Sequence, residues 1–259
     1  MIDAAVVAGL GAVAFAAGFV DSIAGGGGLL TVPALLIAGL DPVTALATNK
    51  IQGLAGSTSA TFAFARRGLI DWRTAWPAAL GSGLASIAGA YCVKLTPRAV
   101  LEAAVPVMLI AIALYFAFGP RITDGDSRAR ISQKAFAFTA APAIGFYDGV
   151  FGPGTGTFFM LAFITLAGLG VVRATAHTKL CNAASNLGSA TFFIFSGAIV
   201  WTIGLAMAAG QFLGAQLGAR LAMKLGVRII RPLLIVVCCA MAAKLLADPA
   251  NPLRHALGF

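Results

Sequence analysis

Long runs of apolar residues dominate the chain, and within them polar residues do not alternate with apolar ones. The runs cover approximately residues 4–24, 28–40, 42–65, 74–94, 98–119, 134–151, 157–170, 172–196, 200–222 and 229–247. Most approach or exceed the roughly 20 residues that a helix needs to cross a bilayer. Transmembrane β-strands would be shorter and would alternate. The pattern therefore predicts an all-α polytopic membrane protein.

The two halves of the chain repeat one another. Gly-Phe-Val-Asp ending at Asp21 matches Gly-Phe-Tyr-Asp ending at Asp148, and a glycine-rich break follows each motif. Further along, Lys50 matches Lys179. Two rows of small residues also match: Gly81, Ala85, Gly89 with Gly210, Gly214, Gly218. Such self-similarity indicates an internal duplication, with a first repeat at 1–119, a polar cytoplasmic linker at 120–133 and a second repeat at 134–259.

Each repeat is expected to hold a glycine-broken helix pair followed by three transmembrane helices. Whether the pair forms a re-entrant hairpin or crosses twice, each half makes an odd number of crossings, so the repeats are inverted. Most loop Lys and Arg residues then lie on one face, which the positive-inside rule assigns to the cytoplasm. The other face carries only Lys94, Arg98, Lys244 and Arg254. Both termini are therefore predicted outside the cytoplasm.

Composition agrees with a lipid-embedded chain. Of 259 residues, 59% are hydrophobic and 10% charged, which excludes a disordered protein, an ordinary cytosolic enzyme and a disulfide-stapled secreted domain. The net charge of +9 is explained by basic loops, and no Lys/Arg run interleaved with aromatics indicates nucleic-acid binding. No Walker motif, metal-ligand spacing or nucleophile elbow is present, so neither a cofactor nor an enzyme activity is expected. The expected partners are the bilayer and a small anion, and a homodimer stays an open alternative.

Lys50 and Lys179 lie about two turns inside apolar helices. A lysine at that depth costs about 3 kcal/mol or more unless it is neutralised, and it generally faces a cavity. Each starts a polar stripe at helical spacing, made of Gly53, Ser57 and Thr61 in one half and Asn182, Asn186 and Ser189 in the other. A stripe of Lys, Asn and Ser suits an oxyanion. Alternatively, each lysine extends to the membrane interface or forms a structural ion pair. The Ser and Asn side chains could likewise form hydrogen bonds between neighbouring helices instead of binding a substrate.

The glycine breaks are the second candidate part of the site. The helix after each break begins with unpaired N–H groups and a partial positive charge, which favours anions. The expected contributors to substrate binding are, besides Lys50, Ser57, Lys179, Asn182 and Asn186, the residues Gly26, Gly27, Gly28, Gly154, Thr155 and Gly156.

Asp21 and Asp148 come about one turn before the breaks. They could neutralise the two lysines, cap nearby N–H groups or carry a proton. His177 lies in the same region, either as a hydrogen-bonded interior residue or as a proton relay. These three residues are the candidates for coupling or for counter-ions.

The sequence resembles the TauE/SafE family of sulfite and organosulfonate exporters, most closely its YfcA-like branch. The matching stretches are Gly25–Pro33, Thr48-Asn49-Lys50, Tyr147–Gly156 and Ala176-His177-Thr178-Lys179, and the resemblance covers nearly the whole chain. It implies transport of a small, sulfur-containing anion across the bacterial inner membrane. The repeats imply a secondary transporter with a midplane site and alternating access. A passive anion channel is the main alternative, and a membrane-embedded enzyme is a weaker one.

Overall fold

The computed structural model describes residues 3–97 and 125–225, together with 99–101, 103, 107, 110, 114, 239 and 243. Within those residues the regular structure is entirely helical, as the apolar runs predict. The helices are α1 (Ala4–Ala24), α2 (Gly27–Ile37), α3 (Pro42–Ala65), α4 (Trp72–Leu95), α6 (Gln133–Phe138), α7 (Ala140–Val150), α8 (Thr155–Thr165), α9 (Val171–Ser196) and α10 (Trp201–Leu225). Of the run predicted at 98–119 the structure describes 99–101, 103, 107, 110 and 114, and of the run predicted at 229–247 it describes 239 and 243.

Aspartates fix the starts of three long helices. The side chain of Asp3 accepts a hydrogen bond from Ala5 N at 3.0 Å, that of Asp41 from Thr44 N at 3.2 Å and that of Asp71 from Arg73 N at 3.2 Å. These carboxylates satisfy N–H groups that have no partner inside the helix and interact favourably with the helix dipole. They explain why the apolar runs and the helices begin within about two residues of each other.

The run at 134–151 is predicted as one helix, and the structure corrects this. It is divided at Thr139, whose φ of −124° and ψ of −76° lie outside the helical region. Pro142 follows three residues later and has no N–H to continue the helical hydrogen bonds. The Thr139 hydroxyl instead donates to the carbonyl of Ala135 at 2.6 Å. The element matching α1 is therefore the pair α6 and α7.

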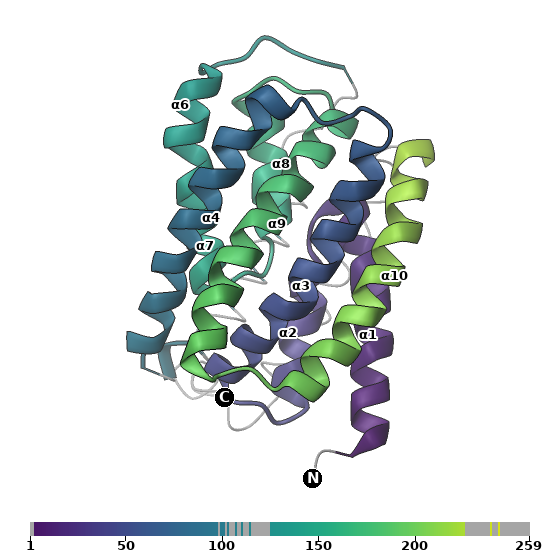
Figure 1. Cartoon of the computed structure of the whole chain (residues 1–259), viewed down its shortest axis with the longest axis vertical. Coiled ribbons are helices and arrows are strands. Elements are labelled where there is room, and N and C mark those ends of the chain that lie inside the picture. Colours follow the sequence, from purple (N-terminus) through teal and green to yellow (C-terminus); the bar gives the residue numbers. More distant parts are fainter. Residues whose placement is uncertain are drawn as a thin grey trace.

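The helices pack across the two halves of the chain. In Figure 1, α1, α3 and α10 run upward while α4, α7 and α9 run downward. The most extensive packing joins α1 to α10 and α4 to α7. In addition, α3 contacts α10, α9 contacts α4, and α3 and α9 contact one another. Exchanging the halves, α1 for α7, α3 for α9 and α4 for α10, reproduces this set of neighbours.

The rows of small residues form the closest of these contacts. A Cβ atom on Gly214 of α10 would lie 3.0 Å from the backbone nitrogen of Phe19 on α1. A Cβ on Gly89 of α4 would lie 2.9 Å from the Cα of Gly149 on α7. Both rows thus pack inside one chain, helix backbone against helix backbone, as small-residue faces do in membranes.

Helix lengths bear on how the chain meets a bilayer. By length and composition, two described helices, α1 and α4, are apolar enough to cross a membrane. The more polar α3, α9 and α10 have 24, 26 and 25 residues. In contrast, α2 and α8 have 11 residues each, about 16 Å, or half the hydrocarbon thickness. Large apolar side chains such as Phe195 (87% exposed) and Phe138 (80% exposed) face outward.

Candidate functional site

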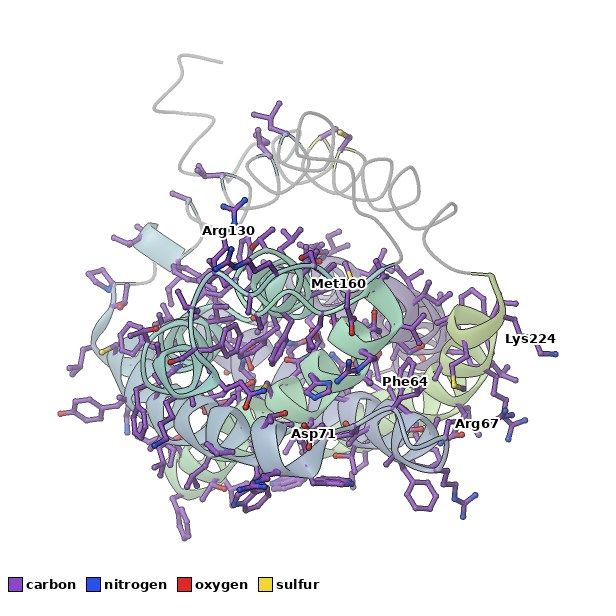
Figure 2. The ribbon with its side chains drawn as sticks, turned by 90° about the horizontal axis from the view of Figure 1, so that it is seen from above. Phe64, Arg67, Asp71, Arg130, Met160 and Lys224 are labelled. Atoms are coloured by element: carbon purple, nitrogen blue, oxygen red, sulfur yellow. The ribbon has the colours of Figure 1, made fainter. Side chains whose placement is uncertain are left out.

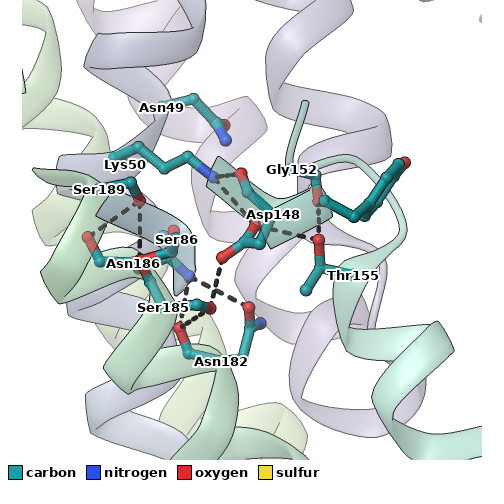
Figure 3. Close-up of polar contacts among 12 residues, drawn as sticks. Asn49, Lys50, Ser86, Asp148, Gly152, Thr155, Asn182, Ser185, Asn186 and Ser189 are labelled. Carbon is teal, nitrogen blue, oxygen red and sulfur yellow. Dashed lines mark hydrogen bonds and ion pairs between the residues drawn. The ribbon is translucent and has the colours of Figure 1, made fainter. Parts of the chain in front are cut away.

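Two buried ion pairs join the halves of the chain. Lys50 Nζ on α3 lies 2.9 Å from Asp148 Oδ1 on α7, and Lys179 Nζ on α9 lies 2.8 Å from Asp21 Oδ2 on α1. Each ammonium also donates to the backbone carbonyl of the same aspartate. Both lysine side chains are 0% exposed, so each charge is neutralised inside the protein. Figure 3 shows the Lys50 pair among its polar neighbours.

The aspartates also hold the glycine breaks, each in its own way. Asp21 Oδ1 accepts from the backbone nitrogens of Gly26 and Gly27, at 2.9 and 3.0 Å, and so caps the start of α2. Asp148 Oδ1 accepts from the hydroxyl of Thr155 at 2.9 Å, and its Oδ2 accepts from the hydroxyl of Ser185. Asp21 therefore combines the counter-ion and capping roles, whereas Asp148 is a counter-ion that is also held by two hydroxyl groups.

The two glycine breaks meet one another directly. Gly25 has a φ of 70°, which favours glycine, and a Cβ there would lie 2.6 Å from the backbone nitrogen of Thr157. A Cβ on Gly156 would lie 2.7 Å from the Cα of Gly25. The Thr157 hydroxyl donates to the carbonyl of Gly25. Glycine is thus required here because the backbones of the two halves touch.

A small polar cavity lies where the breaks meet. Its volume is about 20 Å³, enough for about one water molecule. It is lined by Asp21, Gly26, Gly27, Gly28, Asn49, Gln52, Gly53, Asp148, Gly152, Gly154, Thr155, Gly156, Asn182, Asn186 and Gln211. The N-termini of α2 and α8 therefore reach the same small cavity from opposite halves. Among the described residues, no group of three or more His, Cys, Asp or Glu side chains could hold a metal ion.

Most residues expected from the sequence line this cavity, but some do not. Its walls include the expected Thr155, Asn182, Asn186, both aspartates and the five glycines predicted to bind substrate, Gly26, Gly27, Gly28, Gly154 and Gly156. Lys50 and Lys179 are not, because their ammonium groups are directed to the aspartates. Ser57 donates within its own helix, to the carbonyl of Gly53 at 2.6 Å. His177 lies elsewhere, with Nδ1 2.8 Å from the carbonyl oxygen of Arg173 and its ring packed against Phe163.

Three amide side chains in the cavity wall are not anticipated from the sequence. Asn49 and Gln52 come from α3, where Gln52 Nε2 donates to Asn49 Oδ1 at 2.5 Å. Gln211 comes from α10, and its Nε2 would lie 3.0 Å from a Cβ on Gly27. Gln52 and Gln211 are polar residues inside otherwise apolar runs, a signal that could have identified them. Asn49 lies in Thr48-Asn49-Lys50, one of the stretches that resemble the family, but not in the polar stripe that begins at Lys50.

Two of the amides are incompletely hydrogen-bonded. Gln52 Oε1 and Gln211 Oε1 are buried and have no hydrogen-bond partner among the described residues. Asn182 accepts from Asn186 Nδ2 at 3.1 Å, and its own Nδ2 would lie 3.6 Å from a Cβ on Gly156. An amide nitrogen therefore lies beside the start of each short helix, Gln211 at α2 and Asn182 at α8. Buried amides of this kind are suited to a polar ligand or to water.

Comparison with known proteins agrees with this architecture. The profile of the family described as "Sulfite exporter TauE/SafE" matches residues 10–245. The chain is 55% identical to "Probable membrane transporter protein ORF9" of Sinorhizobium sp, covering 95% of this chain and 94% of that protein. It is 45% identical to "Probable membrane transporter protein YfcA" of Escherichia coli K12, covering 95% and 92%. A "Probable membrane transporter protein" of Haemophilus influenzae is 42% identical, over 91% and 92%.

These matches define a helical membrane transporter. The chain belongs to the TauE/SafE family, as its motifs predict. No solved structure matches it significantly.

Proposed function

We propose that the chain is a secondary transporter that moves a small, sulfur-containing oxyanion across the bacterial inner membrane. The observation that carries the proposal is the meeting of two helix N-termini, from opposite halves, at one polar cavity. Backbone N–H groups and the helix dipole favour an anion at such an end. Inverted-repeat transporters place broken helices at the membrane midplane for this purpose. The proposal that the substrate contains sulfur rests on the name of the family.

The binding groups in this proposal are the starts of α2 and α8 and the amide nitrogens of Asn182 and Gln211. The amide nitrogen of Asn186 already donates to the backbone and side-chain oxygens of Asn182 and holds that residue in place. The lysines act indirectly, because each neutralises the aspartate that holds a break. Without them, two uncompensated carboxylates would border the cavity and repel an anion. Charge-assisted hydrogen bonds from amides and backbone N–H groups are worth roughly 1.5–3 kcal/mol each.

Inverted repeats and alternating access belong to the same proposal. The opposite directions of α1 and α7, of α3 and α9 and of α4 and α10 in Figure 1 support inversion. The upper end in that view carries most of the described loop Lys and Arg residues. Figure 2 looks down on this end, with Arg67 and Lys224 at the rim, and we assign it to the cytoplasm. The short length of α2 and α8 favours a re-entrant hairpin. A cavity of about 20 Å³ holds about one water molecule, so in this proposal it must widen to take up an anion.

Counterflow in proteoliposomes tests the proposal. Vesicles are loaded with unlabelled sulfite, sulfate or methanesulfonate, and uptake of the labelled anion is followed against vesicles without protein. A transporter gives uptake that is stimulated by internal substrate. Uptake that is fast but not stimulated would indicate a channel. No uptake of any oxyanion would contradict the proposed function.

A further inference from the structure

We infer that the cavity binds its oxyanion as a monoanion and discriminates against dianions. The inference rests on the proposed function and specifies its substrate class: hydrogen sulfite or a sulfonate, rather than sulfate or the sulfite dianion. It follows from the charges around the cavity, from the kind of donors in its wall and from how desolvation depends on charge.

The charges bordering the cavity cancel. Among the lining residues that the structure describes, the charged side chains are the carboxylates of Asp21 and Asp148, with no lysine or arginine. Each carboxylate forms an ion pair with a lysine. The distance from the lysine Nζ to the carboxylate oxygen is 2.8 Å for Asp21 and 2.9 Å for Asp148. An anion entering the cavity therefore meets no uncompensated cation, and the nearest charged groups on its path are negative.

The attraction of the cavity for an anion must come from dipoles, and some of these dipoles already interact with a carboxylate of the protein. The donors are helix N-termini and neutral amides such as Asn182 and Gln211. At α2, the N–H groups of Gly26 and Gly27 already donate to the Asp21 carboxylate. The start of α2 is thus partly neutralised before any substrate binds. The carboxylate of Asp148 instead accepts a hydrogen bond from the hydroxyl of Thr155.

The attraction of the anion to the cavity wall and the cost of removing it from water depend differently on its charge. Attraction to fixed dipoles grows in proportion to the charge of the ligand. The Born cost of leaving water grows with its square, so a dianion costs about four times as much as a monoanion of equal size. Doubling the charge doubles the attraction but quadruples the cost. A cavity with neutral, dipolar walls therefore favours the monoanion.

The test is a binding titration of the purified full chain in detergent at constant ionic strength. Methanesulfonate, a monoanion throughout, should bind equally on both sides of the pKa of hydrogen sulfite. Sulfate should bind at least about tenfold more weakly, and sulfite should weaken about tenfold once it becomes the dianion. Sulfate binding as tight as methanesulfonate would overturn the inference and leave the proposed function intact. Failure of every oxyanion to bind would overturn both.

A charge variant gives a second, independent test. Gln211→Lys adds one cation of similar length to the cavity wall, and Gln211→Met is its uncharged control. The ratio of sulfate to methanesulfonate affinity should rise at least about tenfold in Gln211→Lys and should not rise in Gln211→Met, which removes a neutral donor and adds no charge. An unchanged ratio in a folded Gln211→Lys variant would contradict the inference. If that variant does not fold, the wild-type titration still decides.

Discussion

Lys50 and Asp148 come from opposite halves of the chain, yet their charged groups lie 2.9 Å apart in the protein interior. The same contact occurs with the halves exchanged, between Lys179 and Asp21 at 2.8 Å. Each lysine thus holds the aspartate that organises the glycine break of the other half. The ion pairs link the two repeats at the point where their backbones touch.

This relationship predicts the outcome of breaking and then removing one pair. Lys50→Met should destabilise the protein by about 3–5 kcal/mol, because it leaves the Asp148 charge buried without a partner. The double variant Lys50→Met/Asp148→Asn should recover much of that loss, since no uncompensated charge remains. Thermal unfolding of the detergent-solubilised protein measures both effects.

The matched control is Lys134→Met, which removes an exposed lysine. It should change stability little, as surface charges usually do. A Lys50→Met variant as stable as Lys134→Met would mean that the buried pair contributes nothing to folding.

The contact between the glycine breaks gives a second prediction. Gly156→Ala places a methyl group 2.7 Å from the Cα of Gly25, so the two halves must separate or the helix must shift. Gly9→Ala adds the same group in α1 where nothing lies within 4 Å. We expect counterflow to be lost in Gly156→Ala and retained in Gly9→Ala, whose stability should rise slightly from better helix propensity. Equal transport by both variants would show that the close approach is dispensable.

Topology is the third prediction. Single cysteines at Arg128 and Lys224, in a background without native cysteines, should react with an impermeant maleimide from the cytoplasmic side only. A cysteine at Lys94, the repeat equivalent of Lys224, should react from the opposite side only. The reason is the excess of basic residues at one end of the molecule. Reaction of 94 and 224 from the same side would rule out inverted repeats.

The sequence predicts the helices well because apolar runs and glycine breaks are local signals. Residues 42–65 are predicted and observed as one helix. The break of the helix at Thr139 is not predicted, because it depends on Pro142 and on packing. A hydropathy pattern contains information on neither.

The site is predicted less completely because pairing in space is not local. Sequence alone indicates that Lys50 and Asp148 need partners, but 98 positions separate them along the chain. The direction in which Lys50 points is set by Asp148, whose carboxylate lies beside the ammonium group only because of the fold. Gln211 is missed for a similar reason: it reaches the cavity only because Gly56 and Gly27 leave room for its side chain.

The central claim is that amides and helix starts hold the oxyanion while the lysines hold the aspartates. Calorimetric titration of sulfite, as its monoanion, into Asn182→Ala and into Lys50→Met/Asp148→Asn tests it most directly. Losing an amide donor to the anion should weaken binding about ten- to a hundredfold in Asn182→Ala. The neutral-pair variant should stay within about threefold of wild type, because the charge around the cavity is unchanged. The opposite result, tight binding by Asn182→Ala and loss of binding by a folded neutral-pair variant, would show that Lys50 itself binds the anion.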